Sequence, residues 1–168
     1  MTGVYGDSTR SVKASAAEAR PGAPIMMPPV LAAAYHIPPS EDDSLDSYGR
    51  YHNPTWRQLE SAIAELEGAA AALTFGSGMA AITSTLRVLA KPGTTLVVPA
   101  DGYYQVRRYA AEYLAPQGIT VIEATCADML DAASNADVVL AETPSNPGLD
   151  VVDLHRLAMT CRARGATL

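Results

Sequence analysis

The fold is decided by the sequence FGSGMAAITSTLRVLAKPGTTLVV at residues 75–98. A glycine-rich turn at residues 76–78 leads into a segment whose apolar residues recur at helical spacing, and Lys-Pro-Gly at residues 91–93 ends that helix. The apolar run at residues 95–98 then predicts a strand. A turn, a helix and a buried strand in close succession indicate an α/β protein.

The alternation of helices and strands continues on both sides of this stretch. Upstream, Asn53 can cap a helix that has Pro54 at its first position and Gly68 at its end, and the apolar residues 70–75 predict a short strand. Downstream, the pattern predicts helices at 103–114, 127–133 and 153–164, and strands at 119–122, 137–141 and, beginning at the last residues, 166–168. We therefore expect a mostly parallel sheet with helices on both faces, which binds ligands at the carboxyl ends of its strands.

Residues 1–53 have a different composition from the rest of the chain. Proline pairs at 28–29 and 38–39 exclude regular helix there, so we expect an extended arm with one short helix near residues 15–20. A disordered tail would also fit the composition, but apolar residues such as Leu31 give the arm surface with which to pack. We divide the chain into this arm, residues 1–53, and the first part of a larger α/β domain, residues 54–168.

Composition excludes several classes of function. The formal net charge of −6 argues against a nucleic-acid partner, which would require a basic surface. Cys126 and Cys161 are far apart in sequence, so they indicate neither a zinc site nor a disulfide framework, and a reducing cytoplasm is expected. There is no signal-peptide pattern and no apolar run of the roughly 18 residues that a membrane span needs.

Two segments carry residues suited to an anionic ligand. Ser77, Gly78 and Met79 form the turn into a helix, where free N–H groups and the positive end of the helix dipole suit a phosphate. Arg50 can hold an anion through its planar fork, and Tyr48 can add a hydroxyl donor. Each has a simpler alternative, because short glycine turns are common and the loop around Arg50 could merely cap the next helix.

Two further candidates follow predicted strands. Tyr103 could place its ring over a planar ligand. Asn146 stands between two prolines, which make it a rigidly placed amide suited to a cofactor contact, although an ordinary stiff turn fits equally well. The histidines are isolated in sequence and lack the spacing of metal ligands.

Taken in order, these segments resemble the cystathionine synthase and lyase family, the transsulfuration enzymes that use pyridoxal 5'-phosphate (PLP). The matching motifs are Tyr-x-Arg-x-x-Asn-Pro-Thr at 48–55, Leu-Glu-Gly at 66–68, Ser-Gly-Met-Ala-Ala at 77–81, Lys-Pro-Gly at 91–93 and Glu-x-Pro-Ser-Asn-Pro at 142–147. The resemblance covers nearly all of residues 9–168. It implies the aspartate-aminotransferase-like (type I) PLP fold, of which this chain would hold the arm and the first half of the large domain.

The resemblance also implies how the phosphate would be held. Gly78 and Met79, with Ser77 before them, correspond to the donors that bind the phosphate of PLP. Tyr48 and Arg50 correspond to a pair that reaches the phosphate of the cofactor in a neighbouring subunit. This pairing implies a homotetramer built from closely joined dimers, with the arm buried between subunits.

The resemblance assigns the ring contacts as well. Tyr103 corresponds to the residue that stacks on the pyridine ring, and Asn146 to the amide near its phenolic oxygen. Glu142 lies close to Asn146 in sequence, and the resemblance assigns it no specific contact.

This chain departs from the family in a few places. The usual Tyr-Gly-Gly is replaced by Tyr103 followed by Tyr104 and Gln105, whose bulk could narrow the substrate pocket. The cysteine expected close after Tyr103 in a methionine γ-lyase is not there. Trp56 follows Asn-Pro-Thr and shifts the usual arginine by one position, to Arg57, which we expect to be solvated on a helix face.

The largest departure concerns the lysine that forms the Schiff base with the cofactor. Lys13 and Lys91 are the lysines of this sequence, and neither stands in a matching motif. Since PLP enzymes need that lysine, we expect this chain to be an N-terminal fragment that is inactive alone.

For the parent protein, the resemblance implies a cystathionine γ-lyase-like or γ-synthase-like enzyme. It would act on a small sulfur amino acid, remove the α- and β-protons, and eliminate or replace the γ-substituent. An O-acyl-homoserine sulfhydrylase or β-lyase relative is the second interpretation. The third is a non-catalytic remnant or structural polypeptide.

Overall fold

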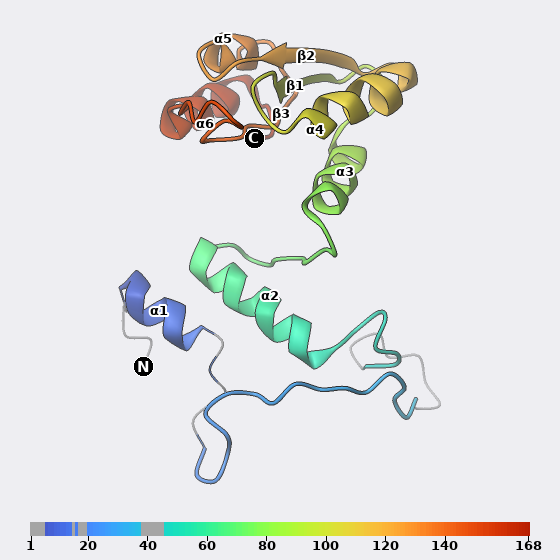
Figure 1. The fold of residues 1–168 in the computed structure, drawn as a ribbon, viewed down its shortest axis with the longest axis vertical. Coiled ribbons are helices and arrows are strands. Elements are labelled where there is room, and N and C mark those ends of the chain that lie inside the picture. The colour runs from blue at the N-terminus through green and yellow to red at the C-terminus, as the bar shows by residue number, and fades with distance from the viewer. Residues whose placement is uncertain (1–5, 15, 17–19, 38–45) are drawn as a thin grey trace. The chain divides into compact units, whose positions relative to one another are not determined.

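The computed structural model describes residues 6–14, 16, 20–37 and 46–168. The chain divides into two units, Met1–Thr74 and Phe75–Leu168 (Figure 1). No helix in the described ranges is both long and apolar enough to cross a membrane.

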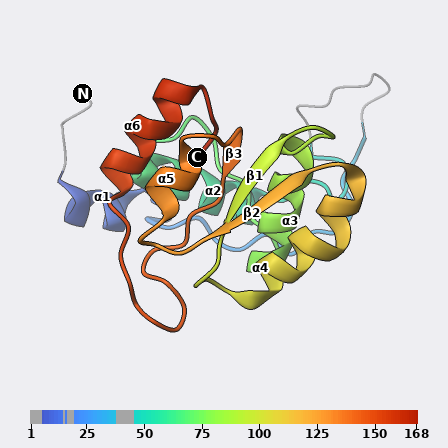
Figure 2. The same cartoon turned by 90° about the horizontal axis from the view of Figure 1, so that it is seen from above.

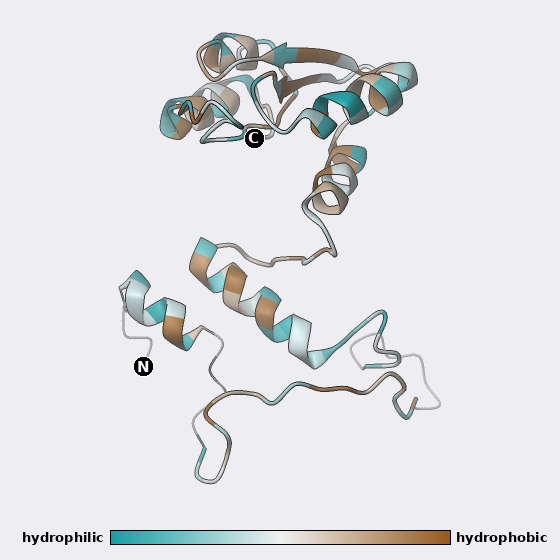
Figure 3. Ribbon diagram, viewed as in Figure 1, coloured by the Kyte–Doolittle hydropathy of each residue, from teal (hydrophilic) through white to brown (hydrophobic). Residues whose placement is uncertain are grey.

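The first unit contains the helices α1 (Asp7–Lys13) and α2 (Pro54–Glu67). The predicted caps of α2 are confirmed: the Asn53 side chain accepts a 2.8 Å hydrogen bond from the N–H of Thr55, and Gly68 ends the helix at a φ of 65°. The Arg10 guanidinium donates to the carbonyl of Glu65 and so joins α1 to the end of α2. Along α2, apolar and polar residues alternate (Figure 3), and Leu59, Ile63 and Leu66 are exposed in this unit.

After α1, the described part of the arm at residues 20–37 is extended and hydrogen-bonded to the residues around α2. The N–H of Val30 donates to the Thr55 hydroxyl at 2.8 Å, and the Asn53 amide donates to the Val30 carbonyl at 3.1 Å. The N–H of Gly49 donates to the Ala33 carbonyl at 2.7 Å. The helix predicted near residues 15–20 falls almost entirely outside the described residues, and α1 was not predicted.

The second unit is built on a parallel sheet in which β1 (Thr95–Pro99) lies between β2 (Thr120–Ala124) and β3 (Val138–Val139). Thr95 lies opposite Thr120 in β2, and Leu96 lies opposite Val138 in β3. Thr167 makes a parallel bridge to Val138, which supports the strand predicted at residues 166–168. The sheet therefore extends past β3 at the end of the chain.

The side chains of β1 divide the core into two layers. Leu96 and Val98 pack on one face with α3 (Gly78–Leu89), α4 (Tyr104–Tyr109) and the π turn that follows it, η1 (Ala110–Leu114). Val97 packs on the other face with α5 (Met129–Ala133) and α6 (Leu154–Arg164). Figure 2 shows these two pairs of helices on opposite sides of the sheet. Successive strand residues point to opposite faces, so this alternation confirms the predicted two-sided α/β fold.

The strand predicted at residues 70–75 is wrong. In the structure the segment between α2 and α3 has no regular secondary structure, and Leu73 is 78% exposed. The Glu60 carboxylate anchors this segment by accepting hydrogen bonds from the N–H and hydroxyl of Thr74. An apolar run becomes a strand only where a neighbouring strand pairs with its backbone, and none of the described residues does so here.

Helix α6 offers a matched test of the core. Leu157 is fully buried, whereas Leu154, one turn earlier, is 50% exposed. We expect Leu157→Ala to lower the free energy of unfolding by about 2–5 kcal/mol, because it removes packed methyl groups and leaves a cavity. Leu154→Ala should change it by less than about 1 kcal/mol. Urea unfolding followed by circular dichroism measures both, and equal losses would contradict the assignment of the buried face.

Candidate functional site

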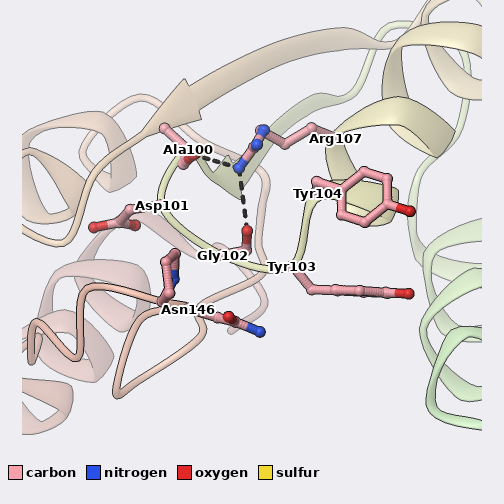
Figure 4. Close-up of a pocket in the computed structure, with 8 residues that line it drawn as sticks. Ala100, Asp101, Gly102, Tyr103, Tyr104, Arg107 and Asn146 are labelled. Atoms are coloured by element: carbon pink, nitrogen blue, oxygen red, sulfur yellow. Dashed lines mark hydrogen bonds between the residues drawn. The ribbon is translucent and has the colours of Figure 1, made fainter.

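The loops that follow β1 and β3 meet at the carboxyl end of the sheet and form an open pocket of about 280 Å³ (Figure 4). Its lining comes from residues 100–104, Arg107, Asn146 and Pro147. This is the edge at which the sequence predicts ligand binding. Of the predicted site residues, the pocket brings together Tyr103 and Asn146.

Tyr103 lies directly before α4 and presents its ring to the pocket, with 40% of its surface exposed. The ring of Tyr104 stands edge-on to it, with the two centroids 5.3 Å apart and an interplanar angle of 66°. The Tyr104 hydroxyl accepts a 2.8 Å hydrogen bond from the side chain of Gln105. Two aromatic rings therefore form one wall of the pocket.

Asn146 faces this wall from a well-braced loop. Its main-chain N–H donates to the carbonyl of Asp101 at 2.8 Å. The neighbouring Ser145 is buried, and it accepts at its hydroxyl from the N–H of Asp150 and donates its own N–H to the Asp150 carbonyl. Among the described residues the Asn146 side-chain amide has no hydrogen-bond partner, and it lies at the pocket (Figure 4).

Glu142 joins the two loops from the end of β3. Its carboxylate accepts a 2.8 Å hydrogen bond from the main-chain N–H of Tyr103. A Cβ atom on Gly102 would lie 2.7 Å from the same carboxylate and 2.6 Å from Cγ of Pro99, so only glycine fits at this close approach. Sequence reasoning noted Glu142 without assigning it a role.

Arg107 braces the same loop from α4. Its guanidinium donates to the carbonyls of Ala100 and Gly102 and lies 3.7 Å from the carboxylate of Glu123. The sequence did not predict these contacts, because no pattern indicates that an arginine within a helix will hydrogen-bond to the preceding loop.

Asp101 is the third organising residue of the pocket. One carboxylate oxygen accepts a 2.9 Å hydrogen bond from the N–H of Cys126, and the other is buried with no hydrogen-bond partner in the described part of the chain. Burial, followed by the interaction with Asp101, raises the pKa of the Cys126 thiol. Cys126 is therefore a buried packing residue that ionises less readily than a free cysteine.

Ser77, Gly78 and Met79 form the start of α3, in the same unit as the pocket but outside its lining residues. The Ser77 hydroxyl caps the helix by accepting from the N–H of Ala80 at 3.1 Å. The N–H groups of Gly78 and Met79 belong to the first turn, which has no intrahelical acceptors. They are the donors that the sequence predicted for an anion.

Tyr48 and Arg50 belong to the other unit, and the structure does not place them with respect to the pocket. Within their own unit the Arg50 guanidinium lies over two rings, 5.0 Å from the centroid of Tyr48 and 5.4 Å from that of Tyr51. Arg50 is exposed, so its charge remains accessible to a ligand.

Arg57 is exposed on α2, as expected, but it also has a partner that was not predicted. We expected a solvated arginine on the helix face, but its guanidinium forms a two-pronged pair with the Asp46 carboxylate at 2.6 and 2.8 Å. The hydrogen bond to Asp46 raises the pKa of Arg57. The pair closes the loop that carries Tyr48 and Arg50. No helical pattern predicts such a partner, because Asp46 lies in the preceding loop.

A parallel sheet covered on both faces, with an aromatic and amide-lined pocket at its carboxyl end, defines the α/β class of ligand-binding domains. The comparisons with known proteins make the assignment specific. The chain belongs to the family of Cys/Met metabolism PLP-dependent enzymes, whose model matches residues 8–168.

The relatives agree with the family. The chain is 44% identical over 167 residues to a Streptomyces coelicolor protein whose name provisionally assigns it as a cystathionine gamma-lyase, covering 96% of this chain and 42% of the relative. It is 35% identical over 147 residues to the cystathionine gamma-synthase of Escherichia coli, covering 84% and 38%. The solved cystathionine gamma synthase of Xanthomonas oryzae pv. oryzae superposes with a TM-score of 0.81 at 31% identity, covering 96% of this chain and 43% of that one. The chain thus spans less than half the length of these relatives.

The residues of the pocket fit the cofactor of this family. A pyridine ring needs an exposed aromatic face, which Tyr103 offers, and its phenolic oxygen needs a donor such as the Asn146 amide. A phosphate needs N–H groups without acceptors, which the first turn of α3 provides.

The buried thiols give a prediction about reactivity. Burial raises the pKa of both Cys126 and Cys161, so at any pH below those values each holds less of the reactive thiolate than a free cysteine does. We expect both to be alkylated at least about tenfold more slowly in the native chain than in urea at pH 8. Peptide mapping after timed iodoacetamide treatment measures each site. Rapid labelling of Cys126 in the native chain would contradict its packing role.

Proposed function

We propose that the protein containing these residues is a PLP-dependent enzyme of sulfur amino-acid metabolism that cleaves or replaces the Cγ–S bond of its substrate, in the manner of a cystathionine γ-lyase. The observation that carries the proposal is the meeting of Tyr103 and Asn146 in one pocket at the carboxyl end of the sheet, in a chain of this family.

When bound, the cofactor supplies an electron sink for the negative charge that develops at the substrate's α-carbon. The residues of this chain would hold and orient it. The ring of Tyr103 would stack on one face of the pyridine, and the Asn146 amide would donate to the phenolic oxygen. The wall formed by Tyr104 would restrict the space beside the ring to a slender substrate.

The phosphate would be held by two groups of donors. The N–H groups of Gly78 and Met79, at the positive end of α3, would donate to it within one subunit. Tyr48 and Arg50 would reach it from a neighbouring subunit. This assignment gives the arm, residues 1–53, its proposed role between subunits of a homotetramer, and we place that assembly in the cytoplasm.

We further propose that the 168 residues do not turn over substrate on their own. PLP enzymes need a Schiff-base lysine, and neither Lys13 nor Lys91 stands in a family motif.

The lyase and synthase alternatives differ in the co-substrate of the parent protein. With water, a γ-lyase converts cystathionine to a thiol, a 2-oxo acid and ammonia, whereas a γ-synthase forms cystathionine from an activated homoserine and cysteine. Supplying each substrate to the purified parent protein with PLP tests the proposal directly. Turnover of neither would contradict the proposal and would leave a sulfhydrylase relative or a non-catalytic polypeptide.

The Tyr103 ring is tested by PLP binding to the 168-residue chain. We expect Tyr103→Ala to raise the PLP dissociation constant by about tenfold, since ring stacking is worth roughly 1–1.5 kcal/mol. Tyr113→Ala is the control, because Tyr113 is also exposed on the helical segment after β1 but lies outside the pocket. Fluorescence titration measures both, and equal dissociation constants would remove Tyr103 from the site.

The phosphate assignment of Arg50 is tested in the full-length parent protein. A charge-assisted contact is worth about 1.5–3 kcal/mol, so Arg50→Ala should weaken PLP retention by about one to two orders of magnitude. Arg50→Lys should rescue it only in part, because it keeps the charge and loses the planar fork. Dialysis followed by cofactor quantification measures retention. If Arg50→Ala holds PLP as tightly as the wild type, the assignment to the phosphate is wrong.

A further inference from the structure

Tyr103 needs an external support for its orientation. It occupies the residue before α4, a position at which the structure shows no side-chain cap. Its ring is partly exposed, and the Tyr104 ring touches it only edge-on. The main chain of Tyr103 therefore has to be held from elsewhere if its ring is to keep one direction.

Glu142 supplies that support. Its carboxylate accepts the N–H of Tyr103 at 2.8 Å, which makes a charge-assisted hydrogen bond. The bond crosses from the loop after β3 to the loop after β1, so it fixes the residue directly before α4 relative to the sheet. Gly102 permits this approach, because a side chain there would collide with the same carboxylate.

A second bond runs between the same two loops. The N–H of Asn146 donates to the carbonyl of Asp101 at 2.8 Å. Tyr103 is thus held by Glu142, and Asn146 is held by Asp101, with one residue between the anchors on one loop and three on the other. The ring and the amide that face each other across the pocket consequently share one hydrogen-bonded frame.

We propose that Glu142 is a positioning residue, which sets the Tyr103 ring against the Asn146 amide for a planar pyridine ligand. This role rests on the proposed function of the pocket. Glu142 lies outside the lining of the pocket, so it acts through Tyr103 and does not contact the ligand.

The proposed role depends mainly on the hydrogen-bond acceptor of Glu142 and less on its charge. Two variants distinguish these properties. Glu142→Ala removes the acceptor and leaves the N–H of Tyr103 to water. Glu142→Gln keeps a carbonyl oxygen at the same reach, so most of the positioning should survive without the charge. Glu112→Ala is the matched control, since the Glu112 carboxylate pairs with Arg108 on the helix surface, away from the pocket.

The experiment measures two quantities in the 168-residue chain. The first is the hydrogen-exchange rate of the Tyr103 amide by NMR without ligand, which reports the bond itself. We expect Glu142→Ala to raise it by about tenfold or more, and Glu142→Gln by less than about threefold. The second is the dissociation constant of pyridoxal 5'-phosphate, which should rise by about fivefold or more in Glu142→Ala and stay within about twofold in Glu142→Gln and Glu112→Ala.

The outcomes distinguish this proposal from the function on which it rests. If Tyr103→Ala binds PLP more weakly than wild type and Glu142→Ala does not, the pocket assignment stands and the positioning role is wrong. An unchanged exchange rate of the Tyr103 amide in Glu142→Ala also overturns the role. If Tyr103→Ala binds as tightly as wild type, the ring is not part of the site and both proposals fail together.

Discussion

The arrangement of the pocket depends on the hydrogen bonds of Asp101. The residue follows the central strand, and it contacts the loops of both flanking strands: its carboxylate accepts from Cys126 after β2, and its carbonyl accepts from Asn146 after β3. Parallel strands pair evenly along their length but leave their ends free, so a loop at the carboxyl edge has no support from the sheet itself. Asp101 provides that support at one point, and the positions of Tyr103 and Asn146 follow from it.

This constraint explains why so small a sheet can hold a defined site. Loops are normally the most mobile parts of a domain, and a site built on them needs bracing from a rigid scaffold. Here that support comes from hydrogen bonds to the two loops and from packing within them. Arg107 turns back from α4 onto the loop carbonyls, and Ser145 is buried within the loop after β3. The unpaired oxygen of Asp101 is the one buried side-chain atom in this frame that the described residues leave without a partner.

Much of the fold could be predicted from the sequence, because the signals were local. Asn53, Pro54 and Gly68 mark the ends of α2 through backbone requirements that a single residue satisfies. The alternation of β1 follows from burial on both faces. The strand prediction at residues 70–75 was wrong because a strand forms only when a second strand pairs with it. The hydrophobicity of a segment does not show whether such a neighbouring strand exists.

The site was predictable only in part, for the same physical reason. Tyr103 and Asn146 stand in recognisable motifs at strand ends, so their meeting could be expected. Two interactions could not be predicted: the hydrogen bond of Glu142 with Tyr103 and the ion pair of Arg57 with Asp46. Both depend on distances in the folded structure, which the sequence spacing of these residues does not indicate. Tyr48 and Arg50 were found through a motif, and their place relative to the pocket stays a prediction.

The π turn in the helical segment after β1 keeps one face of that segment buried. Val106, Ala110 and Leu114 are all buried, at intervals of four residues. On a regular α-helix of 3.6 residues per turn, such a series drifts by about 40° at each step, and the third member would leave the sheet. The π turn at Ala110–Leu114 widens the winding and cancels that drift. Deleting one residue from this turn would restore a regular helix while rotating everything after it by about 100°, so the length of this segment is as much a part of the core as its side chains are.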